Sequence, residues 1–252
     1  MIYKDLLIEL VKREIKARYK QSILGYAWVI IVPLLNLIVL TMVFSYFVRI
    51  PTGNIPYPVF LFTGLIPWTF TANSLISSTS SLVGNSSLIT KIYLPMEVFP
   101  ISTVLVKFID FFLTVIVGVL LVLIFGIKLH PLFIYLPVIF TVQLFLTLGI
   151  SFIFSAMNVF YRDIGNVMGV MVTIWMYLSP VLYPQELIPT QWLPIYNLNP
   201  MASIISAYRN TMLYGVSPAW MSFSYSTVTS ILIFILGLLF FKARAKHFAD
   251  VI

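Results

Sequence analysis

The chain has 252 residues, of which 60% are apolar and 9% are charged, and its formal net charge is +7. Soluble globular domains carry about 25% charged residues and disordered chains have low hydrophobicity, so the composition excludes both classes and indicates a membrane protein. There is no Cys, and His130 and His247 are far apart, which excludes disulfides and zinc–thiolate sites and argues against any metal centre.

Residues 1–22 precede the first apolar run and have an amphipathic pattern. Ile2, Leu6, Leu7, Leu10, Val11 and Ile15 recur at helical spacing, and Lys4, Asp5, Glu9, Lys12, Arg13 and Lys16 occupy the other face. The pattern predicts a helix in the plane of the cytoplasmic membrane interface. Two interpretations are open, a membrane anchor or a docking surface for a cytoplasmic partner, and the mixed-sign charges favour docking.

Residues 23–252 are expected to form an all-α domain of six transmembrane helices, because six apolar segments can each cross about 30 Å of hydrocarbon. The predicted spans are 23–48, 57–81, 99–125, 132–156, 164–183 and 224–241. Six of the fifteen Lys and Arg residues lie in the first twenty positions and three more in the last eleven. Because cytoplasmic segments are enriched in Lys and Arg, both termini are expected in the cytoplasm.

Polar residues inside the predicted spans have several possible roles. Lys107 and Asp110 are three positions apart in the third span, so they share a face and are expected to form an intramembrane ion pair. This pair is a structural clamp or, less simply, part of a proton pathway. Thr and Ser residues between 69 and 81 could pack helices or line a wet path. Gly165 and Gly169 form a small-residue face for helix packing.

The segment 184–223 is long for a membrane loop and is expected to contain two short external helices that dip into the outer interface. Asn199 suits an N-cap, Pro200 suits the first helical position, and Gly215 is placed to end the helix. The segment is either an interfacial aromatic belt or a lid on an external exit. The candidate gate residues are Trp192, Tyr196, Asn199, Pro200 and Tyr208.

No sequence pattern for catalysis or nucleotide binding is present. No Gly is followed directly by Lys, so the chain has no P-loop, and neither HExxH nor GxSxG occurs. Glu186 is the one carboxylate expected on the external side, and nothing near it in sequence supports it. The chain is therefore expected to have no catalytic residue, cofactor or metal of its own.

The segment 18–28 reads Arg-Tyr-Lys-Gln-Ser-Ile-Leu-Gly-Tyr-Ala-Trp and is followed by Pro33. It resembles the RYxxSxLGxxW…P entry motif of bacterial polysaccharide-exporting ABC permeases, the Wzm type of O-antigen exporter and the related teichoic-acid and capsule exporters, in the type 2 ABC transporter permease family. Leu94-Pro95, Tyr161–Ile164 and Asn199-Pro200 resemble the two cytoplasmic loops and the external helix pair of that family. The resemblance covers essentially the whole chain.

The resemblance implies a homodimeric channel in the bacterial inner membrane, among membrane lipids and without nucleic acid. Two copies of a separate cytoplasmic ATPase would bind ATP and Mg and drive a polysaccharide on a polyprenyl-diphosphate lipid outward. The N-terminal helix and the two cytoplasmic loops would contact that ATPase. The docking residues implied are Lys12, Arg13, Lys16, Arg18, Tyr19, Lys91, Tyr93, Glu97, Arg162 and Asp163.

In such a dimer the first and fifth spans would line the conduit, and aromatic rings there would stack on sugar rings. The candidates are Phe44, Tyr46, Trp175, Tyr177 and Tyr183. Helical spacing does not allow Trp175 and Tyr177 to lie on one face, so at least one candidate is misplaced. The mostly uncharged spans favour a neutral glycan. The other classes that stay open are a membrane enzyme acting on a lipid-linked sugar and a secondary transporter that uses Lys107 and Asp110.

Overall fold

The computed structural model of the chain describes residues 2–19, 24–91 and 94–251, and no strand occurs in these ranges. The longer helices are α1 (Ile2–Tyr19), α2 (Trp28–Thr41), α3 (Tyr57–Thr79), α5 (Val98–Ile124), α6 (Leu136–Phe160), α7 (Ile164–Tyr177), α9 (Pro200–Arg209) and α10 (Trp220–Ala245). The short helices are α4 (Ser86–Ile89), α8 (Leu193–Tyr196) and α11 (Phe248–Val251). Single turns are η1 (Gly25–Ala27), η2 (Met42–Phe47), η3 (Val83–Asn85), η4 (Pro131–Tyr135), η5 (Gln185–Leu187), η6 (Thr190–Trp192) and η7 (Asn210–Tyr214).

Five helical segments in the described ranges are long and apolar enough to cross a membrane. They are Trp28–Phe47, Tyr57–Thr79, Val98–Ile124, Pro131–Phe160 and Trp220–Ala245. Each overlaps one predicted span, with ends that differ by a few residues. The predicted start at residue 23 lies outside the described ranges.

The helix within the span predicted at 164–183 is shorter than predicted. Helix α7 has only 14 residues, so it is about 21 Å long, short of the roughly 30 Å of the hydrocarbon core. After Tyr177 the chain turns at Leu178 and continues without helix through Pro184. The physical reason is Pro180, which has no backbone N–H and disfavours helical backbone at Ser179.

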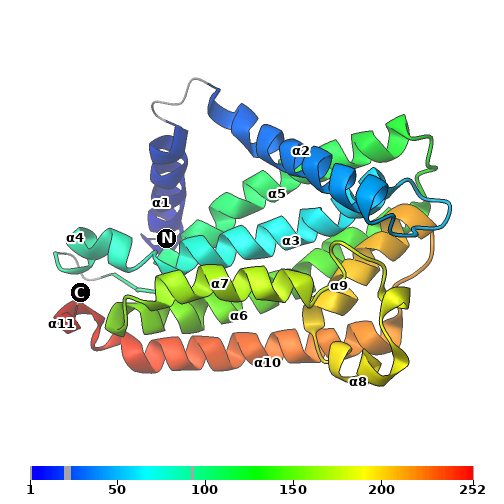
Figure 1. Ribbon diagram of the computed structural model, residues 1–252. Coiled ribbons are helices and arrows are strands. Elements are labelled where there is room, and N and C mark those ends of the chain that lie inside the picture. Colours follow the sequence, from blue (N-terminus) through cyan, green and yellow to red (C-terminus); the bar gives the residue numbers. More distant parts are fainter. Residues whose placement is uncertain (1, 20–23, 92–93, 252) are drawn as a thin grey trace.

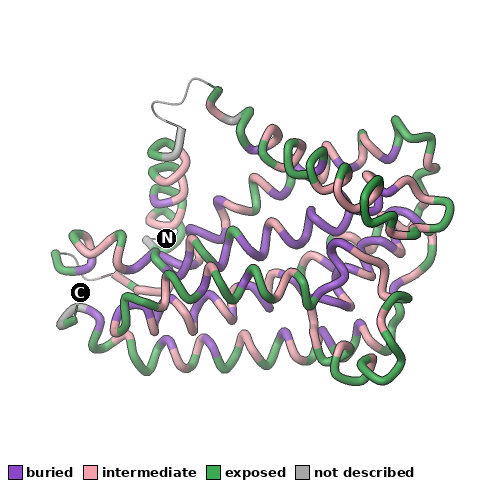
Figure 2. Tube along the Cα trace, in the orientation of Figure 1, coloured by how far each residue is buried: buried purple, intermediate pink, exposed green. Residues whose placement is uncertain are grey.

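The long helices form a bundle with a buried centre. Figure 1 shows α3, α5, α6, α7 and α10 running along one direction, with α2 crossing obliquely and α1 standing across the bundle at one end. The N- and C-termini lie at this same end. Helix α3 packs against α5, α6, α7 and α9, and Figure 2 shows it buried along most of its length.

Two hydroxyl groups of α3, those of Thr71 and Ser78, pack against α6. The hydroxyl of Ser78 donates to Ser151 Oγ at 2.8 Å. The amide of Gln143 donates to Thr71 Oγ1 at 2.9 Å and to the backbone oxygen of Pro67 at 2.6 Å. Ser78, Ser151, Thr71 and Gln143 are fully buried, so these bonds join the two helices.

Glycines at the crossing of α6 and α10 set a very close helix contact. A Cβ added to Gly149 would lie 2.6 Å from the backbone of Ile233, and one added to Gly237 would meet the backbone of Gly149. Glycine at both positions lets the two backbones approach. By contrast, a Cβ on Gly169 would have no described atom within 4 Å, and one on Gly165 would meet only side chains at 3.5 Å or more. Of the expected Gly165–Gly169 packing face, Gly165 therefore lies against other side chains, whereas Gly169 makes no close contact within the described chain.

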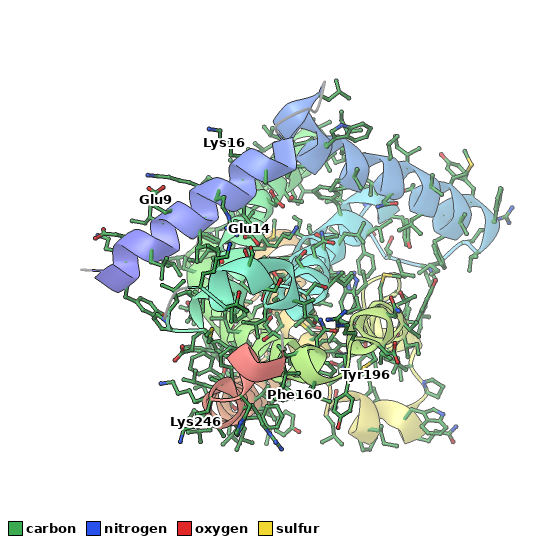
Figure 3. All side chains as sticks on the ribbon, turned by 90° about the vertical axis from the view of Figure 1, so that its left-hand side faces the viewer. Glu9, Glu14, Lys16, Phe160, Tyr196 and Lys246 are labelled. Carbon is green, nitrogen blue, oxygen red and sulfur yellow. The ribbon has the colours of Figure 1, made fainter. Side chains whose placement is uncertain are left out.

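An apolar cluster joins α1 and α11 to the end of the bundle that carries both termini. Its buried residues include Leu10 of α1, Phe248 of α11, and Phe99, Phe152 and Phe241 of the long helices. Figure 3 looks at this end and shows α1 lying across it, with Glu9 and Lys16 pointing away and Glu14 pointing toward the bundle. The location of α1 in a cytoplasmic membrane interface stays a prediction.

Candidate functional site

A set of buried polar groups lies at the end of the bundle opposite the termini, where the chain leaves α7. Ser179, Val181 and Leu182 are almost completely buried although this stretch has no helix. Buried backbone carbonyls outside regular structure need donors from elsewhere, above all at membrane depth. We call the segment 178–184, together with the side chains that hold it, the α7–α9 junction.

Arg209, the last residue of α9, is the main donor of the junction. Its Nε donates to the backbone oxygen of Phe60 at 3.3 Å, and Nη2 donates to that of Val181 at 2.8 Å. Nη1 donates to the backbone oxygen of Pro180. The guanidinium also stacks on the Phe60 ring, with Cζ 3.6 Å from the ring centroid. Arg209 thus links α9, α3 and the non-helical stretch.

Burial disfavours the charged form of the Arg209 guanidinium, and the groups around it counteract only part of this effect. Arg209 is 4% exposed, and burial lowers its pKa to about 10. Tyr214, followed by Tyr196, Tyr57 and Glu186, shifts the pKa in the opposite direction. The guanidinium therefore remains protonated at neutral pH and keeps all of its donors.

Helix α3 provides the space for the guanidinium and a second donor for the junction. A Cβ added to Gly64 would lie 2.5 Å from Arg209 Nη2 and 3.0 Å from the backbone oxygen of Val181, so only glycine leaves room there. The hydroxyl of Tyr57 donates to the backbone oxygen of Leu182 at 2.8 Å. Three consecutive carbonyls, at residues 180–182, are thereby satisfied by side chains.

Asn199 fixes the start of α9 against the end of α7. Its Oδ1 accepts from the backbone N–H of Met201 at 3.0 Å, which makes it the N-cap of α9. The same oxygen accepts from the indole N–H of Trp175 at 2.9 Å. Its Nδ2 donates to the backbone oxygen of Leu178 at 3.1 Å and to Ser179 Oγ at 2.9 Å. Both the donor and the acceptor end of the amide are used.

Helix α9 is packed into the bundle, and its depth relative to the outer membrane interface stays a prediction. It packs against α3, α6 and α10, and Tyr208 is buried with its hydroxyl donating to Gln143 Oε1 at 2.9 Å. The helical stretch ends at Gly215, whose φ of 60° suits glycine. Of the other candidate gate residues, Trp192 is exposed, Tyr196 is half-buried and Pro200 is the first residue of α9. A gating role for any of them stays a prediction.

The aromatic residues nominated for a conduit do not share one surface. Trp175 faces the bundle, where its ring meets that of Trp68 edge-on at 5.8 Å. Tyr46 and Tyr177 are exposed, whereas Phe44 and Tyr183 are half-buried. Tyr183 donates its hydroxyl to the backbone oxygen of Tyr177 at 2.7 Å. A role for this set in carbohydrate contact stays a prediction.

The two charged residues of the third span line one polar space. A cavity of about 340 Å³ lies between α2, α3 and α5, and Lys107, Asp110, Asn36 and Asn73 are among its lining residues. Both Lys107 and Asp110 have interaction partners. The structure brings the two side chains to the same cavity; their pairing with each other stays a prediction.

The docking candidates that the structure describes gather at the end that carries both termini. Lys12, Lys16, Lys91, Arg162 and Asp163 are exposed there. Arg13 donates to Asn85 Oδ1, and Glu97 is half-buried with its carboxylate 3.9 Å from Lys242 Nζ. The side chains of Arg18 and Tyr19, and all of Tyr93, lie outside the described residues. Contact with an ATPase is not tested by these positions and stays a prediction.

Sequence reasoning missed the roles of Arg209 and Gly64. Two signals were present: Pro180 interrupts an apolar run that was read as a span, and Arg209 stands beside the apolar stripe of an amphipathic helix. A cation in such a position indicates buried carbonyls that need donors.

The long apolar helices and the buried polar junction indicate the structural class of the protein. With five membrane-length helices in the described part of the chain and buried polar groups satisfied within the bundle, it is a multi-pass α-helical membrane protein. The profile described as ABC-2 type transporter matches residues 5–213. The chain therefore belongs to the ABC-2 type transporter family of membrane proteins.

Relatives with close to the full length of the chain support this assignment. An O-antigen export system permease protein RfbA of Klebsiella pneumoniae is 31% identical over 252 residues, covering 98% of this chain and 95% of the relative. The protein of the same name from Myxococcus xanthus is 31% identical over 251 residues, with the same coverage. The polysialic acid transport protein KpsM of Escherichia coli is 25% identical over 239 residues, covering 93% of this chain and 91% of the relative.

Proposed function

We propose that this chain is the membrane subunit of an ATP-driven ABC exporter that moves a lipid-linked, O-antigen-like polysaccharide across the bacterial inner membrane. The observation that carries the proposal is the similarity, over 98% of the chain, to permeases named for O-antigen export. The sequence has no P-loop, which supports the part of the proposal that a separate subunit hydrolyses ATP.

The proposal includes six membrane crossings with both termini in the cytoplasm. The termini lie at one end of the bundle, and a chain that returns to its starting side crosses an even number of times. Five helices have membrane length in the described ranges. Helix α7 with the segment 178–184 would complete the sixth crossing, with the α7–α9 junction satisfying the backbone where the helix stops short.

The partners follow from the two ends of the bundle. The exposed charged residues at the bundle end that carries both termini would bind two copies of a cytoplasmic ATPase. A second copy of this chain would complete the conduit. The polar α7–α9 junction would lie at the external end, where the glycan leaves. The polyprenyl-diphosphate carrier is part of the proposal because family resemblance implies it.

A capsule exporter is the second candidate, supported by the 25% identity to a polysialic acid transport protein. That relative is more distant than the O-antigen permeases at 31% identity. The two candidates differ in cargo: that relative is named for an acidic polymer, polysialic acid, whereas the mostly uncharged spans of this chain favour a neutral glycan. Analysis of the polymer that accumulates inside cells lacking this chain distinguishes them: a neutral glycan favours the first candidate and an acidic one the second.

The decisive test is a mild-detergent pull-down of the tagged chain from its native membrane, followed by mass spectrometry. We expect a stoichiometric ABC-type ATPase and ATP hydrolysis only when that subunit is present. An intact, dimeric chain without any ATPase would contradict the proposal and favour a membrane enzyme acting on a lipid-linked sugar.

A further variant separates the exporter from a secondary transporter. Replacing both charged residues of the third span, as Lys107→Met with Asp110→Asn, should leave ATP-driven export intact or reduce only stability. A proton-coupled carrier with the same two substitutions would instead lose transport, and its transport would not depend on an ATPase. Transport into inverted vesicles with ATP, and with a pH gradient alone, measures the difference.

A further inference from the structure

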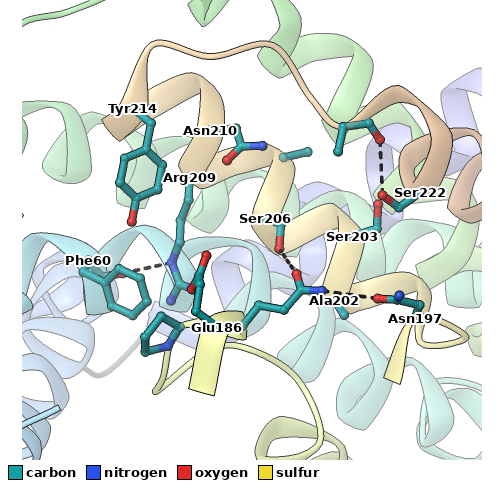
Figure 4. Close-up of a pocket in the computed structure, with 14 residues that line it drawn as sticks. Phe60, Glu186, Asn197, Ala202, Ser203, Ser206, Arg209, Asn210, Tyr214 and Ser222 are labelled. Carbon is teal, nitrogen blue, oxygen red and sulfur yellow. Dashed lines mark hydrogen bonds between the residues drawn. The ribbon is translucent and has the colours of Figure 1, made fainter. Parts of the chain in front are cut away.

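A polar cavity beside the α7–α9 junction has the properties of a binding site that none of the preceding features explains. Its volume is about 210 Å³, and it lies between η5, α9 and the first turn of α10 (Figure 4). Pockets for drug-sized ligands measure roughly 300–1,000 Å³. The cavity is therefore suited to one ring-sized group rather than to a chain.

The lining is rich in neutral hydrogen-bonding side chains. Ser203 and Ser206 come from α9, Asn210 is the first residue of η7, and Gln185, Asn197 and Ser222 come from the facing segments. Hydroxyl and amide groups of this kind both donate and accept. A sugar ring carries hydroxyl groups that also do both, whereas an apolar ligand would leave the lining unsatisfied.

Several of these groups are available to a ligand. The side chains of Ser203 and Asn210 have no hydrogen bond to the described part of the chain. Ser206 donates to Gln185 at 3.4 Å and Gln185 donates to Asn197 at 3.2 Å, both longer than the usual distance of about 2.9 Å. Ligand hydroxyls could replace these long bonds at little cost.

The charges at the cavity favour a neutral ligand over a phosphate. Glu186, which is exposed, contributes a carboxylate, and Figure 4 shows it beside Arg209. The guanidinium of Arg209 is directed at the carbonyls of residues 60, 180 and 181. Arg209 and Glu186 both line the cavity, and their formal charges cancel, so the lining has no net charge to hold an anion.

We propose that this cavity is a subsite for one neutral hexose unit of a glycan. The inference rests on the proposed function, because the exported glycan would be the natural source of that unit. Located at the end opposite the termini, the subsite would hold a sugar of the emerging polymer in each subunit and reduce backsliding between steps of export.

The test uses the purified full-length chain in lipid nanodiscs without an ATPase. Glucoside and maltoside detergents are avoided because their headgroups would compete for the subsite. The probes are the methyl α-pyranosides of glucose, galactose and mannose, with glycerol 3-phosphate as the anionic comparison, and binding is followed by saturation-transfer difference NMR. We expect a signal from at least one hexoside and none from glycerol 3-phosphate.

Substitutions in the lining identify the site of binding. Gln185→Ala, Ser203→Ala and Asn210→Ala should each weaken hexoside binding about fivefold, the effect of one lost hydrogen bond. Ser224→Ala and Asn54→Ala are the matched controls, since both positions are exposed and lie outside the cavity. Gln185 is on a single 3-10 turn, so its truncation leaves the bundle unchanged and keeps the test valid if a variant in α9 folds poorly.

The outcomes separate this inference from the proposed function. No hexoside signal, equal binding by all variants, or preference for glycerol 3-phosphate would each overturn the subsite. ATP-driven export is measured separately with the ATPase present. Export without hexoside binding would leave the proposed function standing and contradict the subsite. Hexoside binding by a chain that never associates with an ATPase would support the subsite and contradict the proposed function.

Discussion

Asn199 shows how much a single side chain contributes to the α7–α9 junction. Its amide caps α9 and also reaches Trp175, Leu178 and Ser179. Asn is therefore required for a reason beyond capping, because Ser or Asp would cap the helix equally well but would lose the two bonds that Nδ2 donates. The residue type encodes the connection between α7 and α9.

We predict that Asn199→Asp destabilises the protein by about 1–3 kcal/mol although it keeps the N-cap, because two donors are lost and each net hydrogen bond contributes about 1 kcal/mol. Such a change corresponds to about 2–4 °C per kcal/mol for a chain of this size. The thermal midpoint of the detergent-solubilised protein measures it. Asn54→Asp, at an exposed loop position, is the control, and equal midpoints for the two variants would contradict the role assigned to Nδ2.

Arg209 depends on the absence of a side chain at Gly64. We predict that Gly64→Ala lowers stability by about 1–3 kcal/mol, the usual cost of overpacking, because the new Cβ would lie 2.5 Å from Nη2. Gly169→Ala, where a Cβ meets no described atom within 4 Å, should be neutral or slightly stabilising in the monomer. Equal effects of the two substitutions in the same thermal assay would show that the guanidinium can move aside freely.

At the scale of helices, close approach of α6 and α10 depends on two glycines whose neighbours are backbone atoms. A side chain can rotate away from a new methyl group, but a helix backbone cannot. We therefore predict that Gly237→Ala costs more than Gly64→Ala, at or above the upper end of the 1–3 kcal/mol range for overpacking. The yield of folded protein after purification and its thermal midpoint measure this. A milder loss than for Gly64→Ala would mean that α10 slides without penalty.

Helix α1 has two faces with different surroundings. Leu10 is buried against the bundle, whereas Lys12 and Lys16 are exposed and are expected to bind the ATPase. We predict that Lys12→Glu with Lys16→Glu weakens ATPase binding about tenfold, because each exposed ion pair contributes about 0.2–1 kcal/mol and reversal adds repulsion. Titration of the purified ATPase against the chain in nanodiscs measures the affinity.

Leu10→Ala is the matched comparison for the charge reversal in α1. It removes buried apolar contacts and should lower the thermal midpoint, whereas the double charge reversal should leave the midpoint unchanged. Unaltered ATPase binding by the charge-reversed chain would assign α1 to membrane anchoring alone.

The elements were predictable where the signal is local. Five spans follow from hydropathy alone, because an apolar run of membrane length has few alternatives. The end of α7 was not predictable from the local sequence, because Leu178, Val181 and Leu182 are as apolar as residues in a membrane span. What holds them outside a helix is Pro180 together with a cation 29 positions away. The exposed docking candidates reach one end because they lie in α1 and in the connections on that side. The position of the conduit aromatics depends on helix rotation, which spacing alone does not determine.

At the scale of the whole molecule, α7 differs from α10 in what it exposes. Only Met168 and Val172 are buried on it, and polar Asn166 and Thr173 are exposed beside apolar residues. The middle of α10 instead exposes a purely apolar face, with residues such as Leu232 and Leu236. The apolar surface of α10 is suited to contact with lipid. The α7 surface, with its exposed polar groups, fits a second copy of the chain or a water-filled conduit.

The absence of Cys from the sequence makes this difference directly measurable. We predict that Thr173→Cys on α7 forms disulfide-linked dimers in native membranes under mild oxidation, because the α7 faces of two copies would lie together around the conduit. Leu232→Cys on α10 should stay monomeric, since lipid separates that face from its neighbours. Non-reducing gels of membranes expressing each single-cysteine chain give the result. Dimers of Leu232→Cys alone would place α10 at the subunit interface and α7 toward lipid.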